Sequence, residues 1–161
     1  MPDTKPWNSD LPLGRFLSLL TKSYFGALTK KLEHLGIEHY YSILITIESN
    51  KGENCCQQSL CDQLHFDKAS MVKRIDYLAK EGLVKRNPNI KDRREHLITL
   101  TDKAKALMAD LHKGINELNT EATRGLNPEQ KEQFYKWLWL VYDNISSQPA
   151  HNVVYNLKKV K

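Results

Sequence analysis

Lysine and arginine side chains gather in one part of this 161-residue chain, where they could bind a polyanion. Residues 65–100 carry nine of them against five acidic side chains, a net charge of +4. Residues 1–64 and 101–145 each have a net charge of −1, and three lysines near the end complete the total of +5. Because the positive charge is local, residues 65–100 are the candidate surface for the phosphates of a nucleic acid.

The three cysteines offer a second chemistry. Cys55, Cys56 and Cys61 lie close together, an odd number with no histidine at the spacing of a zinc site, so we expect reduced thiols. Cys56 falls where a short helix is expected to begin, a position that can lower a thiol pKa. A redox-responsive site using Cys55, Cys56 and Cys61 is therefore an alternative, but Cys55 and Cys61 fall at apolar positions and we favour packing.

Enzymatic chemistry has little support in this sequence. The six histidines are scattered without a nucleophile partner, and the chain has neither a glycine-rich phosphate loop nor a cluster of paired carboxylates. We expect no catalytic residue, no metal and no cofactor. No stretch approaches the roughly 18 uncharged apolar residues of a membrane helix, and the N-terminus lacks a signal-peptide pattern, so we expect a cytoplasmic protein.

The spacing of apolar residues predicts the helices that must position the basic segment. Leucines and aromatics recur at three- and four-residue steps over residues 11–34, and Gly36 ends that helix. Residues 38–49 predict a buried helix and residues 57–64 a short one. Asp67 caps a further helix that runs to Glu81 and stops at Gly82. The last two, joined by a tight turn, form a candidate helix-turn-helix.

Two β-rich runs and two helices follow. Residues 83–87 and 96–100 predict a hairpin, and the segment between them gives it a basic tip. Thr101 caps a helix to about Arg124, and the segment 127–130 is a strong start for a last helix. The order predicts a mainly α fold with a small β-hairpin, as one domain in which only residues 1–9 and 147–161 are weakly structured.

The helix over residues 67–81 has two different faces at about 100° per residue. Met71, Val72, Ile75, Leu78 and Ala79 share one face, whereas Ala69, Ser70, Lys73, Tyr77 and Lys80 lie opposite, with Arg74 on the flank. One face can pack while the other enters the major groove, where lysine and arginine reach guanine acceptors or phosphates. For an isolated helix, a merely solvated charged face is the alternative.

In this order the landmarks resemble the MarR (multiple antibiotic resistance regulator) family of winged helix-turn-helix transcriptional regulators. They are residues 64–75, the stretch 78–86 with its Glu-Gly-Leu-Val, Asp92-Arg93-Arg94, and Leu100-Thr101. The resemblance covers roughly residues 11–145 and implies a bacterial repressor. It also implies a triangular homodimer, with residues 11–36 and 101–145 as dimerisation helices and residues 37–100 as the winged helix-turn-helix.

The resemblance and the charge map together predict the DNA contacts. The recognition helix and the wing supply them: Lys68, Ala69, Ser70, Lys73, Arg74, Tyr77, Lys91, Asp92, Arg93 and Arg94. Asp92 and Arg94 can pair to stiffen the wing, and either Arg93 or Arg94 enters the minor groove. We expect double-stranded DNA with an inverted-repeat operator whose half-sites lie roughly 10 base pairs apart. A winged-helix protein-interaction module without DNA binding is the alternative from another class.

The terminal helices predict a dimer interface, because they are more apolar than one small winged helix can cover. The interface residues are Leu13, Phe16, Leu17, Phe134, Trp137, Leu138 and Val141. A second set could line a cleft for a small aromatic ligand, as in similar proteins: Phe16, Leu20, Tyr24, His39, Tyr40 and Tyr41. Such a ligand would release the repressor by favouring mis-spaced reading heads, although core packing is the alternative for most of these aromatics.

The cysteines depart from what the resemblance implies. Family members that sense peroxide resemble this chain in principle only, because their sensing cysteine lies in the first helix, where this chain has none. The resemblance also predicts serine or threonine at the position of Cys56, so the cap there is expected to be weak.

Overall fold

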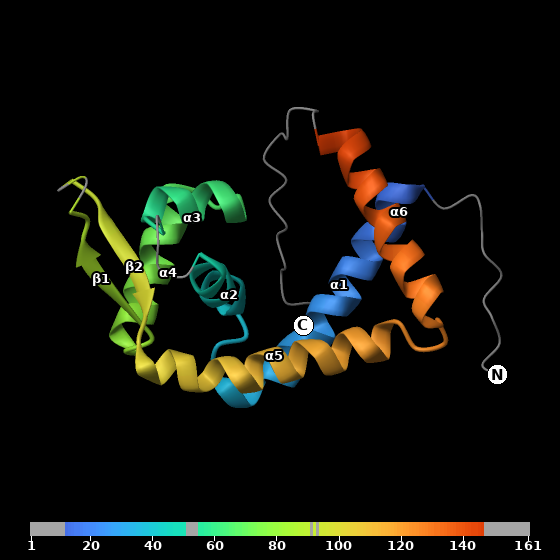
Figure 1. Cartoon of the computed structure of the whole chain (residues 1–161), viewed down its shortest axis with the longest axis horizontal. Helices are drawn as coiled ribbons and strands as arrows, with labels where there is room; N and C mark the ends of the chain where they lie inside the picture. The colour runs from blue at the N-terminus through green and yellow to red at the C-terminus, as the bar shows by residue number, and fades with distance from the viewer. Residues whose placement is uncertain (1–11, 51–54, 91, 93, 147–161) are drawn as a thin grey trace, which may run out of the picture. The chain divides into compact units, whose positions relative to one another are not determined.

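The computed structural model describes residues 12–50, 55–90, 92 and 94–146 (Figure 1). It divides into two compact units, Met1–Ala122 and Thr123–Lys161, and each is taken by itself. The first holds α1 (Leu13–Leu32), the short 3-10 helix η1 (Glu33–Leu35), α2 (Tyr41–Ser49), α3 (Gln57–Leu64), α4 (Lys68–Lys80), β1 (Val84–Pro88), β2 (His96–Leu100) and α5 (Asp102–Ala122). The second holds α6 (Pro128–Ser146). The predicted order of four helices, a hairpin and two helices is confirmed; residues 1–9 and 147–161 lie outside the described residues.

Aliphatic side chains from most elements of the first unit meet in one core. The fully buried ones include Leu28, Leu32, Ile43, Leu44, Ile47, Leu60, Met71, Ile75, Leu78, Ile98 and Leu111. Helix α1 packs along α5, where a Cβ on Gly114 would lie 3.0 Å from Cδ2 of Leu32. The Tyr24 hydroxyl donates to Oδ1 of Asn119 at 2.6 Å and joins the same two helices.

Three element boundaries differ from the prediction. Helix α2 begins at Tyr41 instead of residue 38, because residues 37–40 form a turn closed by the Tyr40 amide donating to the Ile37 carbonyl at 2.8 Å. Strand β1 is displaced by one residue, to Val84–Pro88, and α5 ends at Ala122 instead of near Arg124. The first difference matters most, because it removes His39 and Tyr40 from a helix and places them in a turn.

Helices α3 and α4 form the predicted helix-turn-helix. Helix α3 has the expected bounds, and His65 makes the turn after it with a positive φ of 53°. At the start of α4, the Ser70 amide donates to Oδ1 of Asp67 at 2.9 Å, which satisfies one of the free amides of the first turn. Gly82, with φ 69°, follows the end of α4, as predicted.

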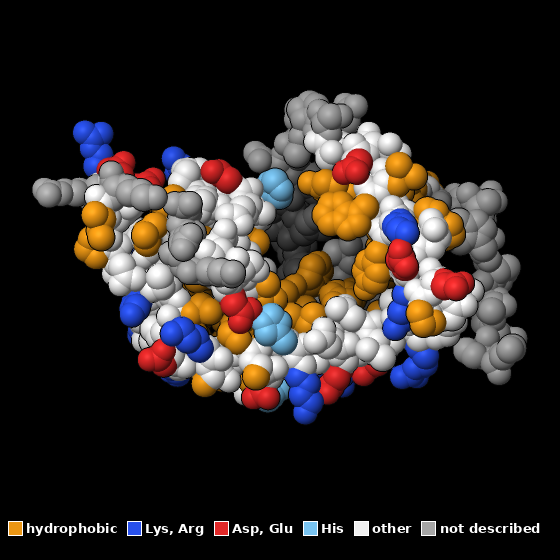
Figure 2. Space-filling model, viewed as in Figure 1, with side chains coloured by type: hydrophobic (Ala, Val, Ile, Leu, Met, Phe, Trp, Pro, Cys, Tyr) orange, Lys and Arg blue, Asp and Glu red, His pale blue; other side chains and the backbone are white. Residues whose placement is uncertain are grey.

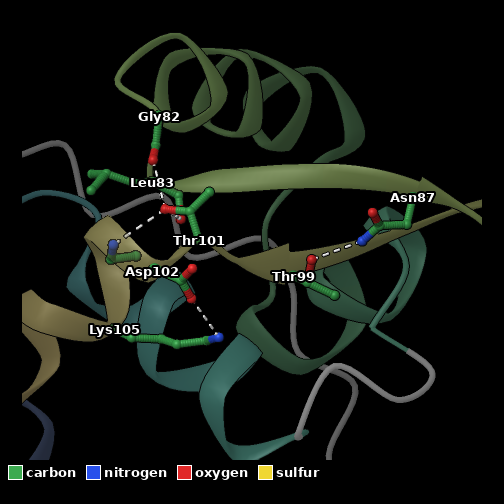
Figure 3. A network of polar contacts seen from close by, with 8 residues as sticks. Gly82, Leu83, Asn87, Thr99, Thr101, Asp102 and Lys105 are labelled. Atoms are coloured by element: carbon green, nitrogen blue, oxygen red, sulfur yellow. Dashed lines mark hydrogen bonds and ion pairs between the residues drawn. The ribbon is translucent and has the colours of Figure 1, made fainter.

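The hairpin is antiparallel, with Val84 opposite Leu100 and Pro88 opposite His96. Thr101 fixes its base, as Figure 3 shows: the hydroxyl donates to the Gly82 carbonyl at 2.6 Å and accepts from the Ala104 amide at 3.2 Å. The predicted cap of α5 is therefore confirmed, and it also ties the start of α5 to the end of α4.

The second unit begins with a capping box. Oδ1 of Asn127 accepts from the Gln130 amide at 2.8 Å, and Oε1 of Gln130 accepts from the Asn127 amide at 2.9 Å, as the sequence predicted. In α6, which is described throughout, no side chain is buried. Figure 2 shows apolar side chains gathered over α6, and Trp137, Trp139 and Ile145 are each more than half exposed. Across the described ranges, no helix is long and apolar enough to cross a membrane.

Candidate nucleic-acid interface

Helix α4 turns an open, basic face outward. Met71, Ile75 and Leu78 are buried on its inner side, whereas Lys68, Ala69, Lys73 and Lys80 are exposed. This agrees with the two-faced helix that the sequence predicted. The face is also anchored, because Asp67 caps the helix start and Thr101 bonds to the residue after its end.

Val72 was assigned to the packed face of this helix, and that assignment is wrong. Its side chain is 38% exposed, because it lies a quarter-turn from the seam that Met71, Ile75 and Leu78 bury. The exposed isopropyl group adds an apolar position to the outer surface of α4. In a major groove such a group can contact the methyl of thymine.

Ser70 is held by the helix cap. Its amide donates to Asp67, and bonds from Ser70, first from its hydroxyl and then from its amide, hold the pKa of the Asp67 carboxyl below its usual range. The carboxylate is therefore charged at neutral pH and complements the positive end of the helix dipole. Ser70 itself is half-buried.

Arg74 and Tyr77, two further predicted DNA contacts, lie against the turn before α2. Nη1 of Arg74 donates to the His39 carbonyl at 3.0 Å, and its guanidinium lies 4.5 Å from the centre of the Phe66 ring. The Tyr77 ring stacks on Tyr40, with centres 4.5 Å apart and planes 14° apart. Both residues thus make contacts inside the protein that the sequence did not predict.

In the wing, Asp92 stiffens the chain through the backbone. Its carboxylate accepts from the Arg94 amide at 2.9 Å, which replaces the side-chain pairing that the sequence predicted. Arg94 is exposed, whereas Lys91 and Arg93 lie outside the described residues. Ile90, which the sequence analysis did not single out, is 98% exposed at the tip.

An ion pair joins the wing to α4. Nη2 of Arg86 on β1 lies 2.5 Å from Oδ1 of Asp76 on α4. The sequence contained both charges but no signal that they meet, because the pairing depends on how the hairpin packs against the helix. The pair helps set the wing and the recognition helix in one fixed orientation.

The six residues predicted to line a ligand cleft lie in different places. Phe16 and Leu20 are exposed on α1, and His39 and Tyr40 lie in the turn facing α4. Tyr41 is half-buried, and burial, with a smaller effect of nearby Tyr24, raises its pKa to about 12. Two cavities among the described residues have other linings, one at the base of the hairpin that includes Lys85, Asn87, Thr99 and Lys105, the other along α5.

Burial of two of the cysteines is confirmed. Cys55 and Cys61 are buried, and burial raises the pKa of both thiols, to about 11 for Cys55. The thiolate is the reactive form, so both are poor redox sensors at neutral pH. Sγ of Cys56 accepts from the Ser59 amide at 3.4 Å and caps α3. Among the described residues, no three His, Cys, Asp or Glu side chains are grouped so that they could hold a metal ion.

The residues predicted for the dimer interface are partly or largely open to solvent. Leu13, Phe16, Trp137 and Leu138 are exposed, and Leu17, Phe134 and Val141 are half-buried. The structure contains one chain, so their role stays a prediction.

Comparison with known proteins decides the family. Residues 38–95 match the model of the MarR family. A MarR transcriptional regulator from Methanosarcina mazei is similar at 28% identity with a TM-score of 0.74, over 81% of this chain and 94% of that one. Wild-type MarR from E. coli in its apo form is similar at 25% identity with a TM-score of 0.71, over 83% and 98%. The chain belongs to the MarR family.

A further MarR-family structure shows the same fold. A transcriptional regulator from Listeria monocytogenes, complexed with 26mer DNA, has 19% identity and a TM-score of 0.75, over 84% of this chain and 90% of that one. The chain is thus a MarR-family transcriptional regulator with a winged helix-turn-helix, and the sequence-based assignment is confirmed. Family and fold are those of transcriptional regulators, not of enzymes.

Proposed function

We propose that this MarR-family regulator binds double-stranded DNA sequence-specifically, with α4 in the major groove and the hairpin tip in the minor groove. The observation that carries the proposal is the outer face of α4, on which Lys68, Lys73 and Lys80 are exposed opposite a fully buried seam. A helix held this way can present its side chains to base edges without losing its own packing.

The surroundings of α4 support the same use. The Arg86–Asp76 pair links the helix to the wing, and the wing ends in exposed Ile90 and Arg94. Arginine and apolar side chains are both found in minor grooves. The Listeria structure contains DNA, and at 19% identity that likeness concerns the fold, so the residues of this chain carry the proposal.

We propose further that the regulator acts as a homodimer on an inverted repeat and represses transcription by occupying it. Exposed apolar residues on α1 and on α6, such as Leu13 and Trp137, support an interface between copies. Release by a small aromatic ligand completes the proposal, and the neighbouring phenols of Tyr24 and Tyr41 are the feature that favours it. Titration of phenol into a chain–duplex complex tests it: release is expected in the wild type and is weakened in Tyr41→Phe.

The salt dependence of binding tests the role of α4. The wild-type chain and Lys73→Ala are titrated with one duplex at several salt concentrations, and Lys113→Ala, which removes an exposed lysine from α5, is the matched control. If Lys73 contacts a phosphate, the slope of log K against log salt becomes shallower by about 0.9 in Lys73→Ala. If Lys73 contacts a base, affinity falls by roughly 1–3 kcal/mol and specificity relaxes at one position.

Two results would contradict the proposal. Equal binding by the wild type, Lys73→Ala and Lys113→Ala would remove α4 from the interface. Wild-type binding without salt dependence would favour the alternative of a protein-interaction module, because neutralised phosphates always release counterions.

A further inference from the structure

The guanidinium of Arg74 lies between two aromatic rings from separate parts of the first unit. Its Cζ is 4.5 Å from the centre of Phe66, in the turn between α3 and α4, and 5.9 Å from the centre of Tyr40, in the turn before α2. Nη1 donates to the His39 carbonyl at 3.0 Å. One side chain of α4 thus contacts both turns that flank the reading helix.

Tyr77, one turn further along α4, extends the contact. Its ring stacks on the other contact partner, Tyr40, with centres 4.5 Å apart. Desolvation in this stack raises the pKa of the Tyr77 phenol, and the charges of Glu81, Tyr40 and Glu38 add to the effect. We call Phe66, Arg74, Tyr40 and Tyr77 the clasp.

The clasp reaches an irregular segment that leads back to α1. Residues 37–40 follow η1 and Gly36, whose φ is 66°, and Ile37 anchors them by burying its side chain. Tyr40 has φ −125° and no side-chain cap, so the start of α2 depends on contacts from outside the helix. The clasp supplies such contacts, all of them from α4 or the turn before it.

We propose that Arg74 is a positioning residue, which fixes the orientation of α4 for reading DNA instead of reading DNA itself; this rests on the DNA binding proposed above. Arginine suits the role because its planar guanidinium stacks on a ring while its edge donates a hydrogen bond. To reach a base or phosphate, Arg74 would have to leave both. Lys73, its neighbour on the exposed side, is the contact residue.

The test uses the full-length chain and a duplex that the wild type enriches from a random-sequence library. Affinity and its salt dependence are measured for Arg74→Ala, Arg74→Lys, Tyr40→Leu and the double variant Arg74→Ala/Tyr40→Leu, with Lys73→Ala as the control for a direct contact. Far-UV circular dichroism confirms that each variant is folded. Arg74→Lys keeps the charge and the stem, so it remains informative if the alanine variant unfolds.

A positioning role predicts that Arg74→Ala and Tyr40→Leu each weaken binding by about 2- to 30-fold, the range of the contacts they remove. The double variant is no weaker than the worse single one, the salt slope stays that of the wild type, and lysine does not restore affinity. Lys73→Ala, in contrast, makes the slope shallower.

Other outcomes would overturn the inference. A slope shallower by about 0.9 in Arg74→Ala, restored by lysine, would make Arg74 a phosphate contact. Relaxed specificity at one base pair in Arg74→Ala, with Tyr40→Leu unchanged, would make it a base contact, and unchanged binding in both would leave it no role. If the wild type enriches no duplex, the proposed function itself fails, and the inference falls with it.

Discussion

Cys56 occupies a position where most helices have serine, threonine, aspartate or asparagine. Its Sγ accepts from the Ser59 amide at 3.4 Å, and sulfur is a weak acceptor. We predict that Cys56→Ser raises the free energy of unfolding by up to about 1 kcal/mol, whereas Cys56→Ala lowers it by roughly 0.5 kcal/mol or more. Urea denaturation of the full chain measures both, and equal stability of the two variants would show that the residue is not a cap.

The same variants address redox sensing. Because α3 needs only an acceptor at this position, DNA binding by Cys56→Ser should respond to peroxide as the wild type does. A response that is present in the wild type and lost in Cys56→Ser would contradict the packing role of the cysteines.

Single residues could be predicted where their partners are close in sequence. Asp67 caps α4 through a bond three residues away, and sequence alone indicated it. The bond from Arg74 to His39 spans 35 residues, and that from Arg86 to Asp76 depends on the packing of a strand on a helix. Such partners follow from the fold, so the sequence could identify the charges but not their use.

At the scale of elements, two glycines give a matched pair. Gly26 lies inside α1, where an added Cβ would meet nothing within 4 Å, and Gly114 lies inside α5, where it would meet Cδ2 of Leu32 at 3.0 Å. Gly26→Ala should raise the free energy of unfolding by up to about 1 kcal/mol, the gain in helix propensity. Gly114→Ala should lower it, because Leu32 is fully buried and overpacking costs about 1–3 kcal/mol.

Thermal or urea unfolding of both variants beside the wild type measures these changes. An equal gain in both would show that Leu32 can move and that the contact between α1 and α5 is loose at Gly114.

Helix ends were predictable where a side chain makes the cap. Asn127 and Gln130 announce α6, and Gly82 marks the end of α4. The start of α2 was not, because Tyr40 precedes it without a side-chain cap and the turn over residues 37–40 is held by backbone bonds and by α4. Periodicity alone extended that helix by three residues.

At the scale of the whole molecule, each unit exposes apolar side chains that a soluble monomer would not need to expose. We predict that the wild type sediments as a dimer and that Trp137→Glu, which places a charge on a residue 59% exposed on α6, shifts it to monomer. Gln133→Glu adds the same charge at a polar position of α6 and should stay dimeric. A wild type that sediments as a monomer would contradict the interface.

The most direct test of the account is selection of duplexes by the wild-type, full-length chain from a random-sequence library, at low and at high salt. The account predicts enrichment of an inverted repeat whose half-site centres lie about 10 base pairs apart, the spacing of two recognition helices on one face of DNA. It also predicts that recovery falls as salt rises. Enrichment of no sequence, or of a site without dyad symmetry, would contradict the claim that α4 of a dimer reads DNA.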